Sequence, residues 1–386
     1  MPVKNRFAEL HDEITSWRRD IHENPEILFE THRTSALVAE KLQGFGCDEV
    51  VTGLGRTGVV GVIKGRGTSS GKVVGLRADM DALPIHETTG LDYASKTPGA
   101  MHACGHDGHT AMLLGAAKYL AETRNFNGTA VIIFQPAEEG GGGGKEMCDD
   151  GLMERFGVQE VYGMHNWPGV EPGTFAIRPG PFFAATDKFD IVVEGKGGHA
   201  AKPHETVDPS VVTAQLITAL QTIVSRNADP IEQAVVSVTS MQTSSHTFNV
   251  IPSRVTLMGT VRTLSAQMRE LTESRMQALC DHIGGAFGAR ITLEYERNYP
   301  VMANHEAQTE FAADVARSVS GQCDHAPLVM GGEDFAFMLE ERPGAYILVG
   351  NGASAPVHHP EYNFNDEVIP AGCSWWAEVV EQRMPT

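Results

Sequence analysis

The sequence predicts an α/β protein, in which a mixed, helix-covered sheet carries an inserted α+β domain of the ferredoxin-like β-α-β-β-α-β type. Apolar strand-like segments alternate with amphipathic helical segments over most of the chain, which is typical of a sheet with helices on both faces. The middle of the chain instead shows the two-residue alternation that indicates strands with one solvated face. The length of 386 residues suits two domains better than one.

Short apolar segments bounded by turn residues predict the strands of the larger domain. In chain order they are residues 56–65, 71–84, 128–140, 158–168 and 344–352. Residues 108–124 have helical periodicity and predict a helix between the second and third of these strands, with Asp107 or Thr110 as the candidate N-cap.

The inserted domain is predicted from consecutive segments in the order β-α-β-β-α-β. They are residues 187–195, 208–226, 233–241, 253–263, 265–287 and 289–297. We therefore expect residues 183–299 to form the insertion, while residues 1–182 and 300–386 form the larger domain.

Composition and charge narrow the class of protein. A net charge of −19 would repel nucleic acid and anionic membrane surfaces. No apolar run reaches the length of a membrane-spanning helix, and residues 1–26 lack the apolar core of a signal peptide, so we expect a cytoplasmic protein. The six cysteines are scattered without a C-x-x-C pair, so no disulfide framework is expected.

Metal-ligand side chains gather where the predicted strands of the larger domain end. The stretch MHACGHDGH places Cys104 and His106 two residues apart, so that both side chains face one point in an extended segment. Other strand ends supply further ligand-type residues, namely Glu138, Glu139, His165, His358 and His359. Because the carboxyl ends of parallel strands meet at one edge, a thiolate, three imidazoles and a carboxylate can hold two metal ions there.

The adjacent acids Glu138 and Glu139 suit hydrolysis. Their side chains diverge, so one can bind metal while the other faces a metal-activated water, whose pKa falls towards about 7 at a zinc site. The alternative is a solvated surface pair, which is less compatible with the buried strand that precedes PAEEG. The histidines are less clearly assigned. His102 and His109 are expected to support the ligands, and spacing does not decide between His358 and His359.

The ordered set of motifs resembles a known enzyme family over nearly the whole chain. The motifs are GLRADMDALP, MHACGHDGHTAMLLGAA, FQPAEEGGGG, GMHNWP, GGHAAKPH, GGEDFAFM and VHHPEYNFND. They resemble the hippurate hydrolase and aminoacylase branch of the dinuclear metallo-aminoacylase/carboxypeptidase family, to which plant auxin-conjugate hydrolases also belong. Each motif is weak alone, but the set is highly specific.

The resemblance implies a role for each candidate residue of the larger domain. Cys104 is similar to the metal-bridging ligand, a position that aspartate holds in sister branches. The other implied ligands are His106, Glu139, His165 and His358, the last because the family pattern His-x-Pro selects the first histidine of HHP. Glu138 matches the general base. Asp79 and Asp81 stand where sister branches keep a metal histidine and its aspartate partner, and are expected to support the ligands.

The resemblance also implies substrate-binding residues in the insertion, which corresponds to the family's lid domain and commonly forms a homodimer interface. His199 matches a histidine that polarises the scissile carbonyl, in some relatives across the dimer. Asn249 and Arg262 resemble a clamp for the substrate carboxylate, and an arginine suits bidentate binding of that group. For all three, a local polar role in a turn or at a strand end is the alternative.

Two further groups of residues are assigned by position alone. Glu333 and Asp334 precede a helical stretch and are expected to cap it, without a chemical role. An acyl pocket is expected to involve the aromatic residues Trp167, Phe182 and Phe183.

The expected activity is that of a metal-dependent amidohydrolase that cleaves N-acyl amino acids, such as hippurate or N-acetyl amino acids. Two divalent ions per subunit are expected, zinc or manganese, and cobalt and nickel share the same ligands. A dipeptidase or exopeptidase would use the same site and stays open. A non-catalytic metal- or small-molecule-binding protein is disfavoured, because the base and all five ligand positions are present.

Overall fold

An eight-stranded mixed sheet forms the framework of the first of two units into which the chain divides. The computed structural model describes residues 4–386. The first unit comprises the described residues up to Gly180, Ala303–Pro327 and Asp334–Thr386. The second comprises Pro181–Met302 and Leu328–Glu333, so it includes a short segment outside the range 183–299 delimited by the sequence pattern.

Four neighbouring parallel strands bring their carboxyl ends to one edge of the large sheet. Across the sheet the order is β1 (Glu49–Leu54), β2 (Gly58–Lys64), β4 (Thr129–Gln135), β3 (Val73–Asp79), β5 (Glu160–Pro168), β16 (Gly344–Gly352), β6 (Phe175–Ile177) and β15 (Asp324–His325). The pairs β4–β3, β3–β5 and β5–β16 are parallel, whereas β1–β2, β2–β4 and β16–β6 are antiparallel. The predicted mixed sheet is therefore confirmed, including the shared edge of its parallel strands.

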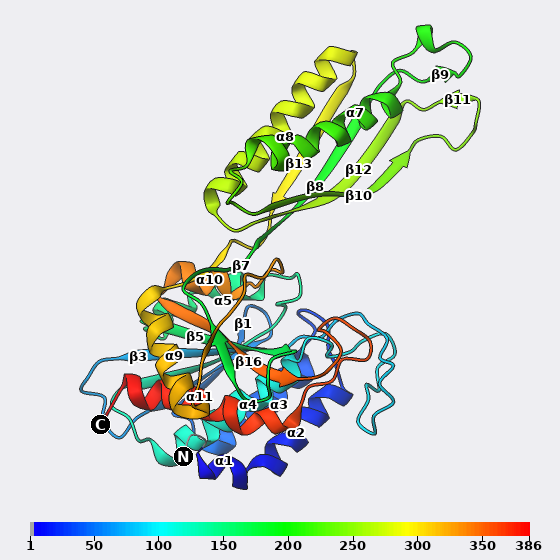
Figure 1. The fold of residues 1–386 in the computed structure, drawn as a ribbon. Helices are drawn as coiled ribbons and strands as arrows, with labels where there is room; N and C mark the ends of the chain where they lie inside the picture. Colours follow the sequence, from blue (N-terminus) through cyan, green and yellow to red (C-terminus); the bar gives the residue numbers. More distant parts are fainter. Residues whose placement is uncertain (1–3) are drawn as a thin grey trace. The chain divides into compact units, whose positions relative to one another are not determined.

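Helices cover both faces of this sheet (Figure 1). One hydrophobic core joins the sheet to α1 (Asn5–Glu9), α2 (His11–Glu23), α3 (His32–Phe45), α4 (His106–Thr123), α9 (Glu306–Ser320) and α11 (Ile369–Arg383). On the opposite face lie α5 (Gly143–Asp149), which contacts β4, and α10 (Phe335–Glu341), which contacts β5 and α5; the short α6 (Leu152–Arg155) follows α5.

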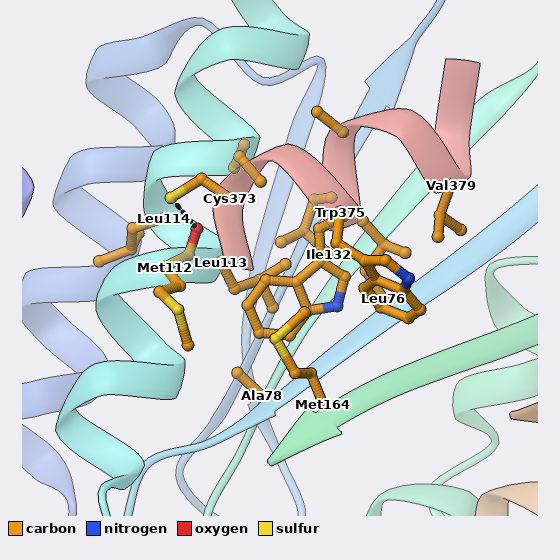
Figure 2. Close-up of a cluster of buried hydrophobic side chains, with 14 of the residues drawn as sticks. Leu76, Ala78, Met112, Leu113, Leu114, Ile132, Met164, Cys373, Trp375 and Val379 are labelled. Carbon is orange, nitrogen blue, oxygen red and sulfur yellow. Dashed lines mark hydrogen bonds between the residues drawn. The ribbon is translucent and has the colours of Figure 1, made fainter. Parts of the chain in front are cut away.

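The core fixes the strand ends from which the polar residues project. Figure 2 shows side chains of β3, β5 and α4 packed around Trp375 of α11. Ala78 and Met164 are fully or almost fully buried, and each directly precedes a polar residue at the sheet edge. Close packing leaves these positions little freedom to shift, so the polar edge is preorganised by the apolar residues beside it.

The start of α4 differs from the expected one. The helix begins at His106 with Gly105 as the N-cap residue, and no side chain caps it. Asp107 is unavailable as a cap, because its carboxylate accepts hydrogen bonds from His22 Nδ1 at 2.8 Å and Arg18 Nη1 at 3.3 Å. Thr110 donates its hydroxyl to the carbonyl of Asp79 at 2.8 Å. Tertiary partners therefore override the local capping preference of both residues.

The second unit has the predicted β-α-β-β-α-β order. Its elements are β8 (Ala185–Glu194), α7 (Pro209–Thr222), β10 (Ala234–Thr243), β12 (Arg254–Thr263), α8 (Ala266–Phe287) and β13 (Arg290–Arg297). The antiparallel sheet has the order β10-β12-β8-β13. Asp208 caps α7 and Ser265 caps α8 with side-chain hydrogen bonds. A two-stranded sheet pairs β9 (Gly198–His199) with β11 (Val250–Ile251).

Some smaller features complete the description. The strands β7 (Gly180–Phe183) and β14 (Met302–Asn304) include the residues at which the chain passes between the units. Short single-turn segments are η1 (Pro203–Glu205), η2 (Ile223–Asn227) and η3 (Asp366–Val368). All six cysteines are free, as their spacing indicates. Among residues 4–386, no helix has both the length and the apolar character needed to cross a membrane.

A buried ion pair between α2 and α4 predicts a loss of stability at alkaline pH. Burial and the positive charge of Arg18 lower the pKa of His22. The charge and hydrogen bond of Asp107 and the hydrogen bond of Glu87 outweigh them and raise the pKa from 6.5 to about 9. A raised histidine pKa stabilises the fold fully below about pH 6.5, and this contribution is lost as pH rises through about 9. We expect unfolding free energy to fall by about 3 kcal/mol across this window.

Chemical denaturation between pH 6 and pH 10 checks this expectation. The His22→Gln variant should show a flatter pH profile, while the control His32→Gln, which alters a side chain that is 70% exposed, should keep the wild-type slope. A wild-type profile as flat as that of His22→Gln would contradict it.

Candidate metal centre

The polar residues at the edge of the large sheet come from the ends of its parallel strands. Asp79 ends β3, Glu138 and Glu139 follow β4, and His165 lies on β5. His358 follows β16, and Cys104 and His106 flank the start of α4. All belong to the first unit.

A left-handed turn at Gly105 brings Cys104 and His106 together. Gly105 has φ 91°, and a Cβ there would lie 2.2 Å from Asn166 Nδ2 and 2.5 Å from the hydroxyl of Tyr362. Only glycine fits this conformation and this space. The two ligands therefore converge through a turn and not, as predicted, through an extended segment.

Two groups of ligand atoms share the sulfur of Cys104. The first is Cys104, His106 and His165, and the second is Cys104, Glu139 and His358. Within each group all ligand atoms lie within 4.8 Å of one another. The Cys104 sulfur is 3.3 Å from His165 Nε2, and His358 Nε2 is 3.3 Å from Glu139 Oε1. The structure thus brings together all five residues that the sequence analysis named as ligands.

Buried polar atoms without hydrogen bonds indicate that this arrangement fits metal ions. Within residues 4–386, neither ring nitrogen of His106 has a hydrogen-bond partner, nor does Glu139 Oε1. The nearest acid oxygens to the His106 ring lie 3.4 Å away on Asp81, 3.7 Å on Asp79 and 3.9 Å on Glu139. Buried polar groups normally have partners, and a thiolate, imidazoles and a carboxylate are the ligands that zinc and related divalent ions take.

The electrostatics also favour cations. Burial, followed by the charges of Glu139, Glu138 and Asp79, raises the pKa of the Cys104 thiol well above its usual value. Burial lowers the pKa of His106, yet Asp79, Asp81 and Glu139 raise it to about 10. The shift of His106 reports surplus negative charge in a buried space, whereas that of Cys104 reports mainly its burial. Divalent ions would balance that charge and hold the thiol as thiolate.

His165 directs one ring nitrogen towards the sulfur of Cys104. Its Nδ1 donates to the carbonyl of Asn166 at 2.5 Å, so the unprotonated nitrogen is Nε2, which faces Cys104. Burial and the neighbouring His109 hold its pKa well below the usual value. A neutral imidazole with its other nitrogen donating to a carbonyl is the usual form of a metal ligand.

Both ring nitrogens of His109 have hydrogen-bond partners, although its ligand atoms also form a close group with those of Asp79 and His106. Its Nε2 accepts hydrogen bonds from the backbone N–H of Asn166 at 2.9 Å and from Asn166 Nδ2 at 3.0 Å. Its Nδ1 therefore donates to Asp79 Oδ1 at 2.6 Å, and neither nitrogen is left for an ion. Asn166 also donates to the carbonyl of Cys104 at 2.7 Å. Asn166 is not among the residues predicted for the site, although its position beside His165 in GMHNWP was a usable signal.

His102 is buried close to His22, with ring centroids 6.3 Å apart. Burial lowers its pKa to about 3, so the ring is neutral. Within residues 4–386 neither of its nitrogens has a hydrogen-bond partner, and it belongs to none of the ligand groups.

Asp81 binds the backbone of the two acids of PAEEG, Glu138 and Glu139. Its two carboxylate oxygens accept from the backbone N–H of Glu138 at 3.0 Å and of Glu139 at 3.1 Å. Burial raises the pKa of Glu139, but the nearby imidazole of His358, followed by the charge of His106, brings it below the usual value. Glu138 is 7% exposed and lies with Glu139 and His106 in a further group of close ligand atoms. Glu139 thus contacts His358, while Glu138 lies beside the two ligand groups that contain Cys104.

The three predicted substrate-binding residues lie in the second unit. His199 and Asn249 are exposed neighbours, because β9 pairs with β11 and the N–H of Ala200 donates to the carbonyl of Asn249 at 3.1 Å. Arg262 lies on β12, half-buried, and donates to the carbonyl of Val261 at 2.9 Å and to the Thr260 hydroxyl. Burial lowers its pKa.

Two positional expectations are wrong. Asp334 occupies the N-cap position of α10, but its side chain makes no capping hydrogen bond. It accepts from Arg77, Gln135 and the backbone of Gly144, because these buried donors require an acceptor. The aromatic rings of Phe182 and Phe183 are 0% and 4% exposed, so they pack inside the protein and do not line an open pocket, whereas Trp167 is half-buried beside His165.

The neighbouring histidines after β16 provide a matched test of the second ligand group. His358 faces Glu139, whereas the exposed His359 accepts a local hydrogen bond from the N–H of Glu361 at 3.2 Å. We expect His358→Ala to lower zinc affinity by more than about 10-fold, since even residues that only orient ligands have effects of that size. Competition with a chelating dye measures the affinity. His359→Ala should match wild type, and equal losses in both variants would contradict the assignment.

Comparison with known proteins gives a consistent picture. A model of peptidase family M20/M25/M40 matches residues 75–382. The chain is 44% identical to hippurate hydrolase of Campylobacter jejuni over 97% of both chains, and 37% identical to N-acetylcysteine deacetylase of Bacillus subtilis over 96% of both. The solved structure of a dinuclear metal binding peptidase of the M20 family from Bacillus subtilis has a TM-score of 0.86 and 34% identity, and the match covers 98% of this chain and 99% of that one.

Proposed function

Because the chain belongs to peptidase family M20/M25/M40, we propose that it is a metal-dependent amidohydrolase that cleaves N-acyl amino acids to a carboxylate and a free amino acid. Two relatives support this substrate class, since one is named a hippurate hydrolase and the other an N-acetylcysteine deacetylase. Both are similar to this protein over almost the whole chain. The observation that carries the proposal is the pair of ligand groups joined at Cys104, with the acid Glu138 beside them.

The residues divide the work of hydrolysis. Cys104, His106 and His165 would hold one divalent ion, and Cys104, Glu139 and His358 the other. When bound, the two ions polarise the amide carbonyl and lower the pKa of a water. Glu138 takes the proton from that water and delivers it to the nitrogen of the leaving amine. Asp81 supports this role by fixing the backbone of the turn, since it accepts from the N–H groups of Glu138 and Glu139.

The second unit would supply the groups that bind the substrate. His199 would donate to the carbonyl oxygen as negative charge develops on it, and Asn249 and Arg262 would bind the carboxylate of the amino acid. The exposed position of His199 and Asn249 supports such a role. We propose that residues 183–299 form a lid, which also makes a homodimer interface. We further propose zinc or manganese as the bound ions, and the cytoplasm as the location of the protein.

Turnover by metal-reloaded protein tests the proposed function. The protein would be stripped of metal, reloaded separately with zinc and manganese, and assayed on N-acetyl, N-benzoyl and aminoacyl derivatives of several amino acids. We expect metal-dependent release of the free amino acid from the N-acetyl or N-benzoyl substrates. Preferential cleavage of the aminoacyl substrates would identify a dipeptidase instead, and tight binding without turnover would identify a binding protein.

A further inference from the structure

The side chain of Asp334 ties together three buried segments of the first unit. It is 0% exposed and accepts a hydrogen bond from Arg77 Nη2 on β3 at 2.9 Å. Gln135 Nε2, at the end of β4, donates to both of its oxygens at 2.8 and 2.9 Å. The backbone N–H of Gly144 in α5 donates to it at 2.8 Å. One carboxylate thus serves donors on two strands and on the segment that follows PAEEG.

Arg77 extends this cluster to the ligands. It is fully buried, and its Nη1 donates to Asp79 Oδ2 at 2.8 Å while its Nε donates to Gln135 Oε1 at 2.8 Å. The same oxygen of Asp79 lies 3.7 Å from His106 Nε2, and the other accepts from His109. A continuous series of contacts therefore runs from Asp334 through Arg77 and Asp79 to the ring of His106.

Up to His106, the acids of this series outnumber its cations. Asp334 and Asp79 are two carboxylates beside the single guanidinium of Arg77, and all three side chains are fully buried. A buried charge is costly unless an opposite charge balances it. The surplus negative charge faces His106, where it would attract a cation. Without Asp334, the positive charge of Arg77 would act on Asp79 alone and weaken that attraction.

Asp334 also contacts the turn that carries Glu138 and Glu139. Gly144 lies close to Asp334, since a Cβ there would lie 2.9 Å from the Asp334 carbonyl and 3.1 Å from Gln135 Oε1. The intervening turn is closed by the N–H of Gly143, which donates to the carbonyl of Ala137 at 3.1 Å, next to Glu138. Asp334 therefore anchors one end of this turn, and Asp81 holds the other.

We propose that Asp334 is a positioning residue of the metal centre, which orients His106 through Arg77 and Asp79 and fixes the turn with Glu138 and Glu139 through Gly144. This role rests on the function proposed above, because the centre it supports is the one assigned there. Groups that orient metal ligands commonly alter metal affinity by about 10–100-fold.

The variant Asp334→Asn keeps the shape of the side chain and removes its charge. We expect its zinc affinity, measured by competition with a chelating dye, to fall by about 10–100-fold. With saturating zinc, kcat should fall while KM for the N-acyl amino acid stays close to wild type. The absorption bands of the cobalt-loaded protein, which report the cysteine ligand, should shift in the variant.

The matched control is Glu160→Gln. Glu160 lies at the opposite end of β5 from the site and pairs with Arg383 Nε at 2.6 Å. This control removes an ion pair of the same unit, so it should lower stability while leaving zinc affinity and the cobalt spectrum unchanged. If Asp334→Asn behaves in the same way, with lost stability alone, Asp334 is merely structural and the proposal is overturned.

A second variant protects the test against misfolding. Gln135→Met removes the hydrogen bonds to Arg77 and Asp334 without changing charge, and should lower zinc affinity in the same direction. If Asp334→Asn does not fold, Gln135→Met decides the question, and an unchanged zinc affinity in that variant would count against the proposal. If the wild-type protein cleaves no N-acyl amino acid, the proposed function fails, while the zinc affinities still decide the role of Asp334.

Discussion

Replacing Glu138 by glutamine is expected to lower kcat by about 10²–10⁴-fold while the metal content stays at the wild-type level. The amide cannot take a proton from water, so proton transfer to the leaving amine loses its carrier. Glu138 belongs to neither of the two ligand groups that contain Cys104, so both ions should remain bound. Steady-state kinetics on an N-acyl amino acid and metal analysis of the same sample measure the two quantities.

The control for this change is Glu146→Gln. Glu146 lies on α5 and forms an ion pair with Arg56 at 2.6 Å, away from the ligand groups. The same chemical change at this position should leave kcat near wild type. Full activity in Glu138→Gln with metal bound would exclude Glu138 as the base. A loss of activity accompanied by loss of metal would instead assign Glu138 to metal binding.

Replacing Cys104 by alanine is expected to remove both metal ions together. Its sulfur is common to both ligand groups, whereas His358 belongs to only one of them. The bound-metal stoichiometry of Cys104→Ala should therefore fall further than that of His358→Ala, and activity should fall by more than about 10²-fold. Elemental analysis after dialysis, with activity on the same substrate, checks this expectation.

A second thiol gives the control for Cys104→Ala. Cys148 is a half-buried free cysteine on α5 and belongs to none of the ligand groups. Cys148→Ala should keep both ions and full activity. Retention of one tightly bound ion in Cys104→Ala would show that the sulfur serves a single ion and does not bridge two.

The sequence predicted the main elements of the fold because their signals are local. The two-residue alternation in Arg254–Thr263 and the apolar run in Thr129–Gln135 each match a strand of the structure. Shorter elements gave no such signal. The strands β6 and β15 have three and two residues, too few for any periodicity, and only their partners in the sheet define them.

Prediction of the candidate site was equally uneven. Ligand types at strand ends were readable, since Glu139 and His165 follow or occupy apolar runs whose direction the sheet topology fixes. Sequence position gave Asp334 a capping role, because it stands before a helix. Its actual partners, Arg77, Gln135 and Gly144, lie at least 190 positions away along the chain, so only the folded chain brings them to its carboxylate.

By itself the sequence determined which residue types are present and at which strand ends they stand, because apolar periodicity and turn residues act over a few positions. The tertiary structure decided how the histidines divide. His106 lies between acids without a hydrogen bond among residues 4–386, while both nitrogens of His109 are taken by Asp79 and Asn166. The physical reason is that a ring nitrogen can bind metal only where no donor or acceptor occupies it, and those partners come from distant strands.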